Sequence, residues 1–230
     1  MTFPNSSRHY LDRFAADAGA ACPENALMLD AGAGKCPYKY HFAHARYESA
    51  DICQIEREYG QITYVCDLRM IPVEDARFDF VFFSQTLEHV PDPCDVLAEL
   101  FRVMKPGASI WLSAPLFYEE HEQPWDFYRY TQFGFKHLLE KAGFEMTDIQ
   151  WLEGYFGTLS YQCKCAAAYL PKRRSDYGTG IKSVVRWIWG LGMKAVFAAN
   201  AFIFSHMDRA VKFTGKGMCK NYRVVARKPA

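Results

Sequence analysis

The sequence lacks the features of a disulfide-stapled, zinc-binding or exported chain. Its eight cysteines include no CxxC pair, and the closest two, Cys163 and Cys165, are separated by a single residue, a poor signal for zinc. The opening residues, MTFPNSSRH, contain no apolar run of the kind found in signal peptides. No repeat or low-complexity tract occurs. We therefore expect a cytoplasmic protein with reduced thiols and no metal ion.

The chain also has almost no net charge, but its two signs are separated. There are 27 Lys+Arg and 26 Asp+Glu in 230 residues, half of which are hydrophobic, so a disordered chain is excluded and a single domain is expected. Residues 1–163 hold 13 Lys+Arg and 24 Asp+Glu, whereas residues 164–230 hold 14 and two. The basic residues 164–230 are therefore expected to contact an anionic group. The candidates are the acidic residues 1–163, a phosphate-bearing substrate, nucleic acid and a membrane.

Short apolar runs alternate with helical patterns along the first 151 residues. Helical spacing occurs at 8–21, at 94–104 and after Thr131, a plausible helix N-cap. The expected strands are 26–30, 46–52, 62–67, 78–83, 109–115 and 144–151, with a last one at 222–227. Strands that alternate with helices predict an α/β fold with a mainly parallel sheet.

Acidic residues end the first three expected strands. The first runs into Asp30-Ala-Gly-Ala-Gly34, and the next two end at Asp51 and Asp67. Ligands of open parallel sheets bind at the carboxyl ends of the strands, where glycine lets the backbone approach them closely. Asp51 could accept both ribose hydroxyls or cap a helix, and Asp67 could read a purine edge or be a plain loop acid. Pro37 stands where the dinucleotide fingerprint needs a small residue, which disfavours NAD.

Taken together, these segments resemble the motifs of class I S-adenosylmethionine-dependent methyltransferases, specifically the type 11 methyltransferase-domain group. The most specific are the LEHVPDP of residues 87–93 and the RVMKPG of residues 102–107, and the likeness spans about 25–151 plus the final strand. It implies a Rossmann-like sheet of seven strands, mainly parallel with the last antiparallel, and helices on both faces. This chain departs from compact members of the group by a helical insertion before the last strand. The third glycine of the family is missing around Lys35-Cys-Pro37.

The resemblance also implies which residues would hold S-adenosyl-L-methionine. Asp51 would bind the ribose, and Asp67 the exocyclic amine of the adenine. The adenine would lie between Ile52 and Leu68. The methionyl end and the sulfonium would be lined by Asp30, Gly32, Ala33, Gly34, Ser84, Gln85 and, as a further candidate, His89.

Methyl transfer to oxygen or nitrogen also needs a proton acceptor and walls for the substrate. The loop 116–131 offers both. His121 is our first choice as general base, with Asp126 as its orienting group or the base itself and His89 as the competitor. The alternative for His121 is a solvated loop histidine. We expect Trp125, Tyr128 and Arg129 to close over the substrate, although Arg129 could equally form a structural ion pair.

A magnesium-assisted mechanism is the less favoured alternative. Oxygen-rich side chains in this loop could surround Mg²⁺, but their spacing matches no known motif. They are Glu119, His121, Glu122 and Asp126.

The segment 152–220 is helical, basic and apolar, and it forms the insertion within a single methyltransferase domain of residues 1–230. Lys194 lies inside the apolar run 181–204, which argues against a transmembrane span, and Gly190 and Gly192 are expected to divide the run into two helices. Three interpretations stay open: a substrate- or core-covering helical subdomain, a homodimer interface, and peripheral contact with the inner face of a membrane. Nucleic acid is disfavoured, because the aromatic residues do not alternate with basic ones.

The expected reaction is methyl transfer to oxygen on a small molecule or saccharide, which would be lipid-linked if the segment meets a membrane. Two alternatives remain: a nucleotide-dependent oxidoreductase, and a protein that binds S-adenosylmethionine without catalysis.

Overall fold

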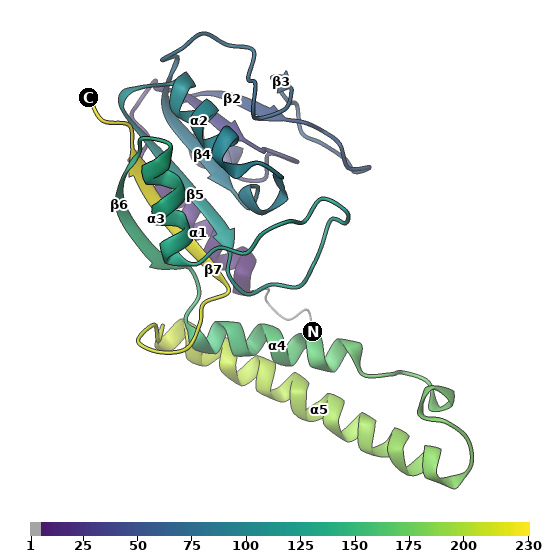
Figure 1. Ribbon diagram of the computed structural model, residues 1–230. Helices are drawn as coiled ribbons and strands as arrows, with labels where there is room; N and C mark the ends of the chain where they lie inside the picture. Colours follow the sequence, from purple (N-terminus) through teal and green to yellow (C-terminus); the bar gives the residue numbers. More distant parts are fainter. Residues whose placement is uncertain (1–5) are drawn as a thin grey trace. The chain divides into compact units, whose positions relative to one another are not determined.

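The computed structural model describes residues 6–230, which divide into two compact units. Tyr10–Leu152 and Asn221–Ala230 form the sheet unit, and Glu153–Lys220 forms the main part of the helical unit (Figure 1). The two units are described in turn.

The sheet unit contains one sheet of seven strands in the order β3-β2-β1-β4-β5-β7-β6. Only β7 runs antiparallel to its neighbours, β5 and β6. The α/β class and the antiparallel last strand are thus confirmed. The strands are β1 Leu27–Ala31, β2 Arg46–Asp51, β3 Tyr64–Val65, β4 Phe78–Ser84, β5 Met104–Pro115, β6 Glu145–Trp151 and β7 Asn221–Arg227.

Helices cover both faces of this sheet, as the alternation of strand residues requires. Phe14 of α1 packs on Phe82 of β4 with ring centroids 5.6 Å apart. Tyr222 of β7 contacts Phe135 of α3 at 6.1 Å, whereas the next residue, Arg223, lies over Trp111 on the α1 side. The helical elements are α1 Ser6–Ala21, α2 Pro93–Val103, α3 Gln132–Lys141 and the 3₁₀ turns η1 Lys39–Phe42 and η2 Leu87–His89.

Local signals explain where most of these elements begin and end. Thr131 caps α3, since its hydroxyl accepts a 3.1 Å hydrogen bond from the amide of Gly134. Both faces of β4 are buried, because its sequence FDFVFFS is apolar on each side except at Asp79. Burial of each such phenylalanine stabilises the fold by about 1.5–3 kcal/mol. β3 is shorter than expected, with two residues in place of the run 62–67.

The helical unit consists of α4 Tyr155–Tyr169, η3 Arg174–Tyr177 and α5 Ile181–Ala210. Figure 1 shows α4 lying along α5. The Ser160 hydroxyl donates to the carbonyl of Ala201 at 2.7 Å, and Phe156 stacks on Phe204.

The expected break of the apolar run at Gly190 and Gly192 is wrong, because α5 is one continuous helix of 30 residues. Gly190 has a packing reason to be glycine: a Cβ there would lie 2.2 Å from the Tyr177 hydroxyl. Gly180–Ala210 is also long and apolar enough to cross a membrane, with 17% of its most apolar window buried. Its exposed apolar side chains include Ile181, Val185, Ile188, Trp189, Val196 and Ile203.

Candidate functional site

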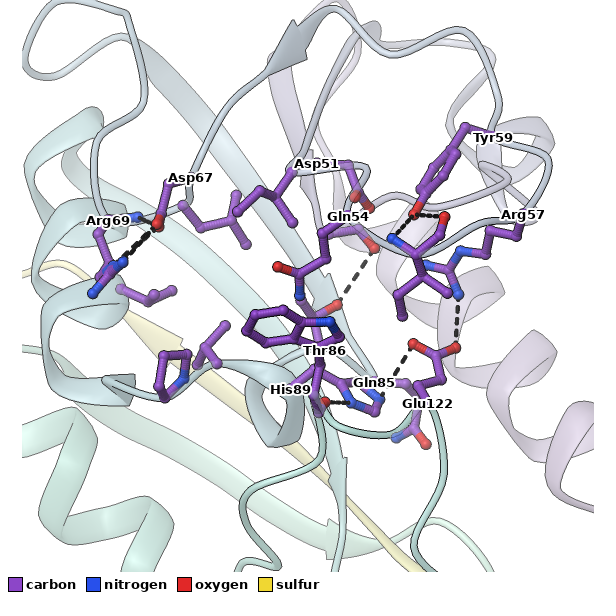
Figure 2. A pocket seen from close by; sticks show the side chains of 18 residues that line it. Asp51, Gln54, Arg57, Tyr59, Asp67, Arg69, Gln85, Thr86, His89 and Glu122 are labelled. Atoms are coloured by element: carbon purple, nitrogen blue, oxygen red, sulfur yellow. Dashed lines mark hydrogen bonds and ion pairs between the residues drawn. The ribbon is translucent and has the colours of Figure 1, made fainter.

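A cavity of about 280 Å³ lies at the carboxyl ends of β1, β2 and β4. Figure 2 shows Asp51 and Asp67 on one side of it and His89 and Glu122 on the other. Eight of the residues predicted for the site line it, from the ends of four strands, β1 to β4, and from the loop after β5. They are Gly32, Asp51, Ile52, Asp67, Leu68, Gln85, His89 and Trp125.

Asp51 is the best-positioned acid of the cavity. Its side chain is buried, and its two carboxylate oxygens accept hydrogen bonds from the amides of Gly34, at 2.9 Å, and Cys53, at 2.8 Å. Each oxygen keeps a further acceptor position, because an ionised carboxylate has about four. Asp51 therefore fixes the turn after β1 and can still accept hydrogen bonds from a ligand.

The backbone at the strand ends is held in left-handed conformations. Gly32 has a φ of 70°, and a Cβ there would lie 2.2 Å from the Thr86 side chain. Cys53, Gln85 and Glu122 have φ values of 51–54° without being glycine. Such conformations cost about 1–3 kcal/mol each and cluster at functional sites, so their gathering around one cavity supports its role.

Four residues predicted for the cofactor lie outside the cavity lining: Asp30, Ala33, Gly34 and Ser84. Asp30 is buried behind the first turn, where the Tyr47 hydroxyl donates to it, and burial raises its pKa to about 7. Ser84 shares a 2.8 Å hydrogen bond with Ser113 on β5. Gly34 contributes its amide to Asp51, so it shapes the site through that acid.

Asp67 lines the cavity but is already engaged. Arg69 contacts both of its oxygens, at 2.8 Å in the shortest bond, and also pairs with Asp92 at 2.7 Å. The hydrogen bonds from Arg69 lower the pKa of Asp67. Leu68 is buried beside it and Ile52 is 43% exposed, so the two apolar side chains differ in how much surface they offer a ligand.

Sequence reasoning missed the segment after β2. Gln54, Ile55, Arg57 and Tyr59 line the cavity, and Arg57 forms a 2.7 Å ion pair with Glu122 (Figure 2). The pair joins positions 65 residues apart and follows no local periodicity. The sequence pattern points to Glu122 only as a candidate magnesium ligand.

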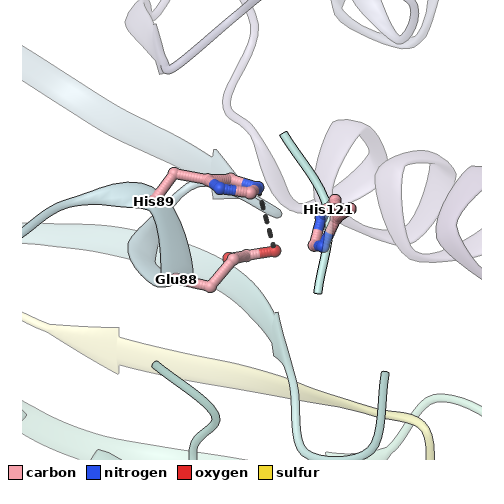
Figure 3. Close-up of side chains that lie close together, drawn as sticks. All are labelled: Glu88, His89 and His121. Atoms are coloured by element: carbon pink, nitrogen blue, oxygen red, sulfur yellow. Dashed lines mark ion pairs between the residues drawn. The ribbon is translucent and has the colours of Figure 1, made fainter. Parts of the chain in front are cut away.

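Two histidines and a buried glutamate meet beside the cavity (Figure 3). One ligand atom from each of Glu88, His89 and His121 lies within 4.8 Å of the other two. His89 lines the cavity, whereas His121 packs edge-on against it with ring centroids 4.6 Å apart. Burial lowers the pKa of His89 and raises that of Glu88 to about 8. Our first choice of base, His121, is therefore set further from the cavity than its competitor.

The Asp126–Arg129 pair is structural. Arg129 donates two hydrogen bonds to Asp126, at 2.6 and 2.7 Å, and three to the carbonyls of Tyr118, Glu119 and Tyr128. All five of its N–H groups are engaged, which argues against our prediction that Arg129 binds substrate. The same bonds lower the pKa of Asp126 to about 2, which makes it a poor base, while its Oδ2 stays 3.3 Å from His121 Nδ1.

Tyr128 also has a structural contact, since its hydroxyl donates to the carbonyl of Pro91 at 3.0 Å. Trp125 is 38% exposed at the rim of the cavity. Of the three predicted substrate residues, Trp125 is thus the one whose side chain both lines the cavity and keeps exposed surface.

Comparisons with known proteins place the chain among methyltransferase sequences. Residues 29–112 match the family described as "Methyltransferase domain". A Mycolicibacterium smegmatis protein named "Probable S-adenosylmethionine-dependent methyltransferase" is 28% identical over 109 residues, which are 44% of this chain and 42% of that one. A ubiquinone biosynthesis O-methyltransferase of Pseudomonas putida is 37% identical over 59 residues, covering 26% and 24%. The matched regions therefore span less than half of these relatives.

A solved structure shares the fold over nearly the whole chain. The 1,6-didemethyltoxoflavin-N1-methyltransferase of Burkholderia thailandensis, solved with 1,6-didemethyltoxoflavin and S-adenosylhomocysteine, superimposes with a TM-score of 0.56. Identity is 16%, and the match covers 96% of this chain and 79% of the other.

Proposed function

We propose that the chain is a class I S-adenosylmethionine-dependent methyltransferase of the type 11 group, which the family match over residues 29–112 and the methyltransferase relatives support. The proposed reaction moves a methyl group from S-adenosylmethionine to a hydroxyl of a small molecule or saccharide. The observation that carries it is the cavity at the strand ends, lined by Asp51 and Gly32.

The residues of this cavity fit the cofactor. Asp51 keeps free acceptor positions for ribose hydroxyls, and Leu68 and Ile52 offer apolar surface for an adenine. Gly32 brings backbone to the cavity where a side chain would collide with Thr86. Arg69 occupies Asp67, so an adenine amine would share that carboxylate with the guanidinium.

The opposite end of the cavity suits the acceptor. When bound, the cofactor supplies an electrophilic methyl group on a sulfonium, and an in-line attack then needs an aligned oxygen and a route for its proton. His89 and Glu122 lie at this end, with Nε2 of His89 3.9 Å from Oε2 of Glu122. Trp125 gives the same end an aromatic wall. The O-methyltransferase name of the Pseudomonas relative supports oxygen as the acceptor atom.

Calorimetry and a turnover assay test the proposal. We expect S-adenosylhomocysteine to bind and a panel of phenols, catechols and saccharides to include an acceptor that yields it from S-adenosylmethionine. Binding of NAD without S-adenosylhomocysteine would instead identify an oxidoreductase. Binding of S-adenosylhomocysteine with no turnover on the panel would favour the non-catalytic alternative.

We also propose that α5 lies on a membrane surface, which would suit a lipid-linked acceptor. Trp189 and Ile188 are 64% and 58% exposed on this helix, and Lys182 and Arg186 flank them. Tryptophan with nearby cations is typical of helices that rest at the headgroup level. The test is flotation with vesicles of neutral and of anionic lipid, with binding expected to the anionic ones. No flotation together with a dimer in solution would assign the helix to subunit contact.

A further inference from the structure

Glu88 is a buried acid of the sheet unit whose carboxyl group lacks hydrogen bonds to other residues. Its side chain has no exposed surface, and neither carboxylate oxygen has a hydrogen-bond partner elsewhere in the described chain. An uncompensated buried carboxylate is costly, so such groups are normally paired or bound to a cation. Nε2 of the neighbouring His89 lies 3.9 Å from its Oε1.

Both histidines of the cluster are oriented as metal ligands are. His89 Nδ1 lies 2.6 Å from the carbonyl oxygen of Trp125, and His121 Nδ1 lies 3.2 Å from that of Glu119 and 3.3 Å from Asp126. These partners are acceptors, so each Nδ1 carries the proton and each Nε2 keeps its lone pair. A carbonyl or carboxylate behind the ring is the usual support of a ligating histidine.

The scaffold around the three side chains is fixed from two segments of the chain. The carbonyl of Glu88 accepts hydrogen bonds from the amides of Phe127 and Tyr128, at 2.9 and 3.3 Å. The Tyr130 hydroxyl donates to the carbonyl of Leu87 at 2.9 Å. The loop after β5 is thereby fastened along η2, which holds His121 beside Glu88 and His89.

We propose that Glu88, His89 and His121 bind a divalent transition-metal ion, with zinc as the first candidate. Two imidazoles and one carboxylate suit zinc and its neighbours better than magnesium, which prefers oxygen. One nitrogen of each histidine and one carboxylate oxygen of Glu88 lie within 4.8 Å of one another. Zinc bonds of roughly 2.0–2.2 Å in a tetrahedron need donors about 3.4 Å apart, so closure takes shifts on the order of 1 Å. Three protein ligands leave one position open.

The role of this ion rests on the proposed function. His89 lines the cavity, so the open position can take the hydroxyl of the acceptor. The ion withdraws electron density from that oxygen, whose proton passes to water. The electron pair of the oxygen forms the new C–O bond, while the pair of the breaking C–S bond stays on sulfur.

Metal content and cobalt spectroscopy test the site without reference to turnover. Untagged full-length protein is stripped with a chelator, loaded with Zn²⁺ or Co²⁺ and dialysed. We expect one ion per chain and the visible absorption of four-coordinate Co²⁺. Glu88→Gln and His121→Ala each lower zinc affinity at least tenfold, whereas His137→Ala, which changes an exposed histidine on α3, leaves it unchanged.

The outcomes separate this inference from the proposed function. Absence of zinc binding, or equal binding by Glu88→Gln, overturns the metal site, and calorimetry with S-adenosylhomocysteine on the same stripped protein shows whether each variant is folded and the cofactor site intact. Zinc binding without S-adenosylhomocysteine binding leaves the metal site standing and removes the proposed function. Because His121 is partly exposed, His121→Ala keeps the test valid if Glu88→Gln fails to fold.

Discussion

The sheet unit and the helical unit differ in how far they bury their apolar side chains and pair their charged ones. In the sheet unit, large apolar residues such as Phe82 are 1% exposed, and the acids at the strand ends are tied to backbone amides or arginines. In the helical unit, α5 leaves Ile181 82% and Trp189 64% exposed. Residues 153–220 also hold 11 Lys+Arg against three Asp+Glu. The first pattern is typical of a folded core that carries a ligand cavity. The second is typical of a surface that contacts a partner or a membrane.

The largest expected effect contrasts the two kinds of packing. Phe82→Ala leaves a void between β4 and α1, and we expect it to lower the free energy of unfolding by about 3–5 kcal/mol. The matched change in α5, Phe202→Ala, removes a ring that is 49% exposed and should cost less than about 1 kcal/mol. Denaturant titration of both variants measures this, and equal losses would contradict the contrast.

Asp51→Asn examines the site of the sheet unit. The amide keeps the shape of the side chain but loses the charge and one acceptor, so affinity for S-adenosylhomocysteine should fall by about 1–3 kcal/mol. Glu140→Gln, an exposed change on α3, is the control for calorimetry. Vesicle binding should not change in either variant. Unaltered affinity in Asp51→Asn would remove the ribose role.

Asp30 gives the sheet unit a predicted pH dependence. Its pKa is raised to about 7 in the folded protein, so the unfolded chain releases the proton first and stability falls as pH rises from about 4 to 7. Asp30→Asn lacks this loss. Relative to the natural protein its unfolding free energy should rise over that range by at least the ~1.4 kcal/mol that one pKa unit represents. Melts at pH 5 and 7.5 that show a constant difference would rule this out.

Trp189→Ala should have the smallest effect on the free energy of unfolding but a clear effect on binding to vesicles. Since the side chain is 64% exposed, unfolding should change by no more than about 0.5 kcal/mol. Under the proposed membrane contact, binding to anionic vesicles should weaken severalfold because the indole would be lost from the headgroup region. Met70→Ala, an exposed apolar change in the sheet unit, is the control, and a similar weakening in both variants would argue against an anchor on α5.

The sequence predicted what is encoded locally. Apolar runs such as FDFVFF predicted the strands, Thr131 predicted a helix start, and Asp51 was identified because a strand ends there. Long-range contacts escaped it. Arg57 pairs with Glu122, which lies 65 residues away in the sequence. Gly190 suggests a helix break in the sequence, but in the structure Tyr177 packs against it within a continuous helix. The sequence also did not predict that Glu88, within the LEHVPDP motif, is fully buried.

The five hydrogen bonds of Arg129 have a consequence for how the substrate range of this chain could diverge. They secure the backbone of the loop after β5 at Tyr118, Glu119 and Tyr128 without using any outward-facing side chain. Trp125 and Phe127, 38% and 42% exposed, can therefore be exchanged while the loop keeps its course. The backbone of this loop is held independently of its exposed side chains. Substitutions at these side chains can therefore change the proposed acceptor range without a change of fold.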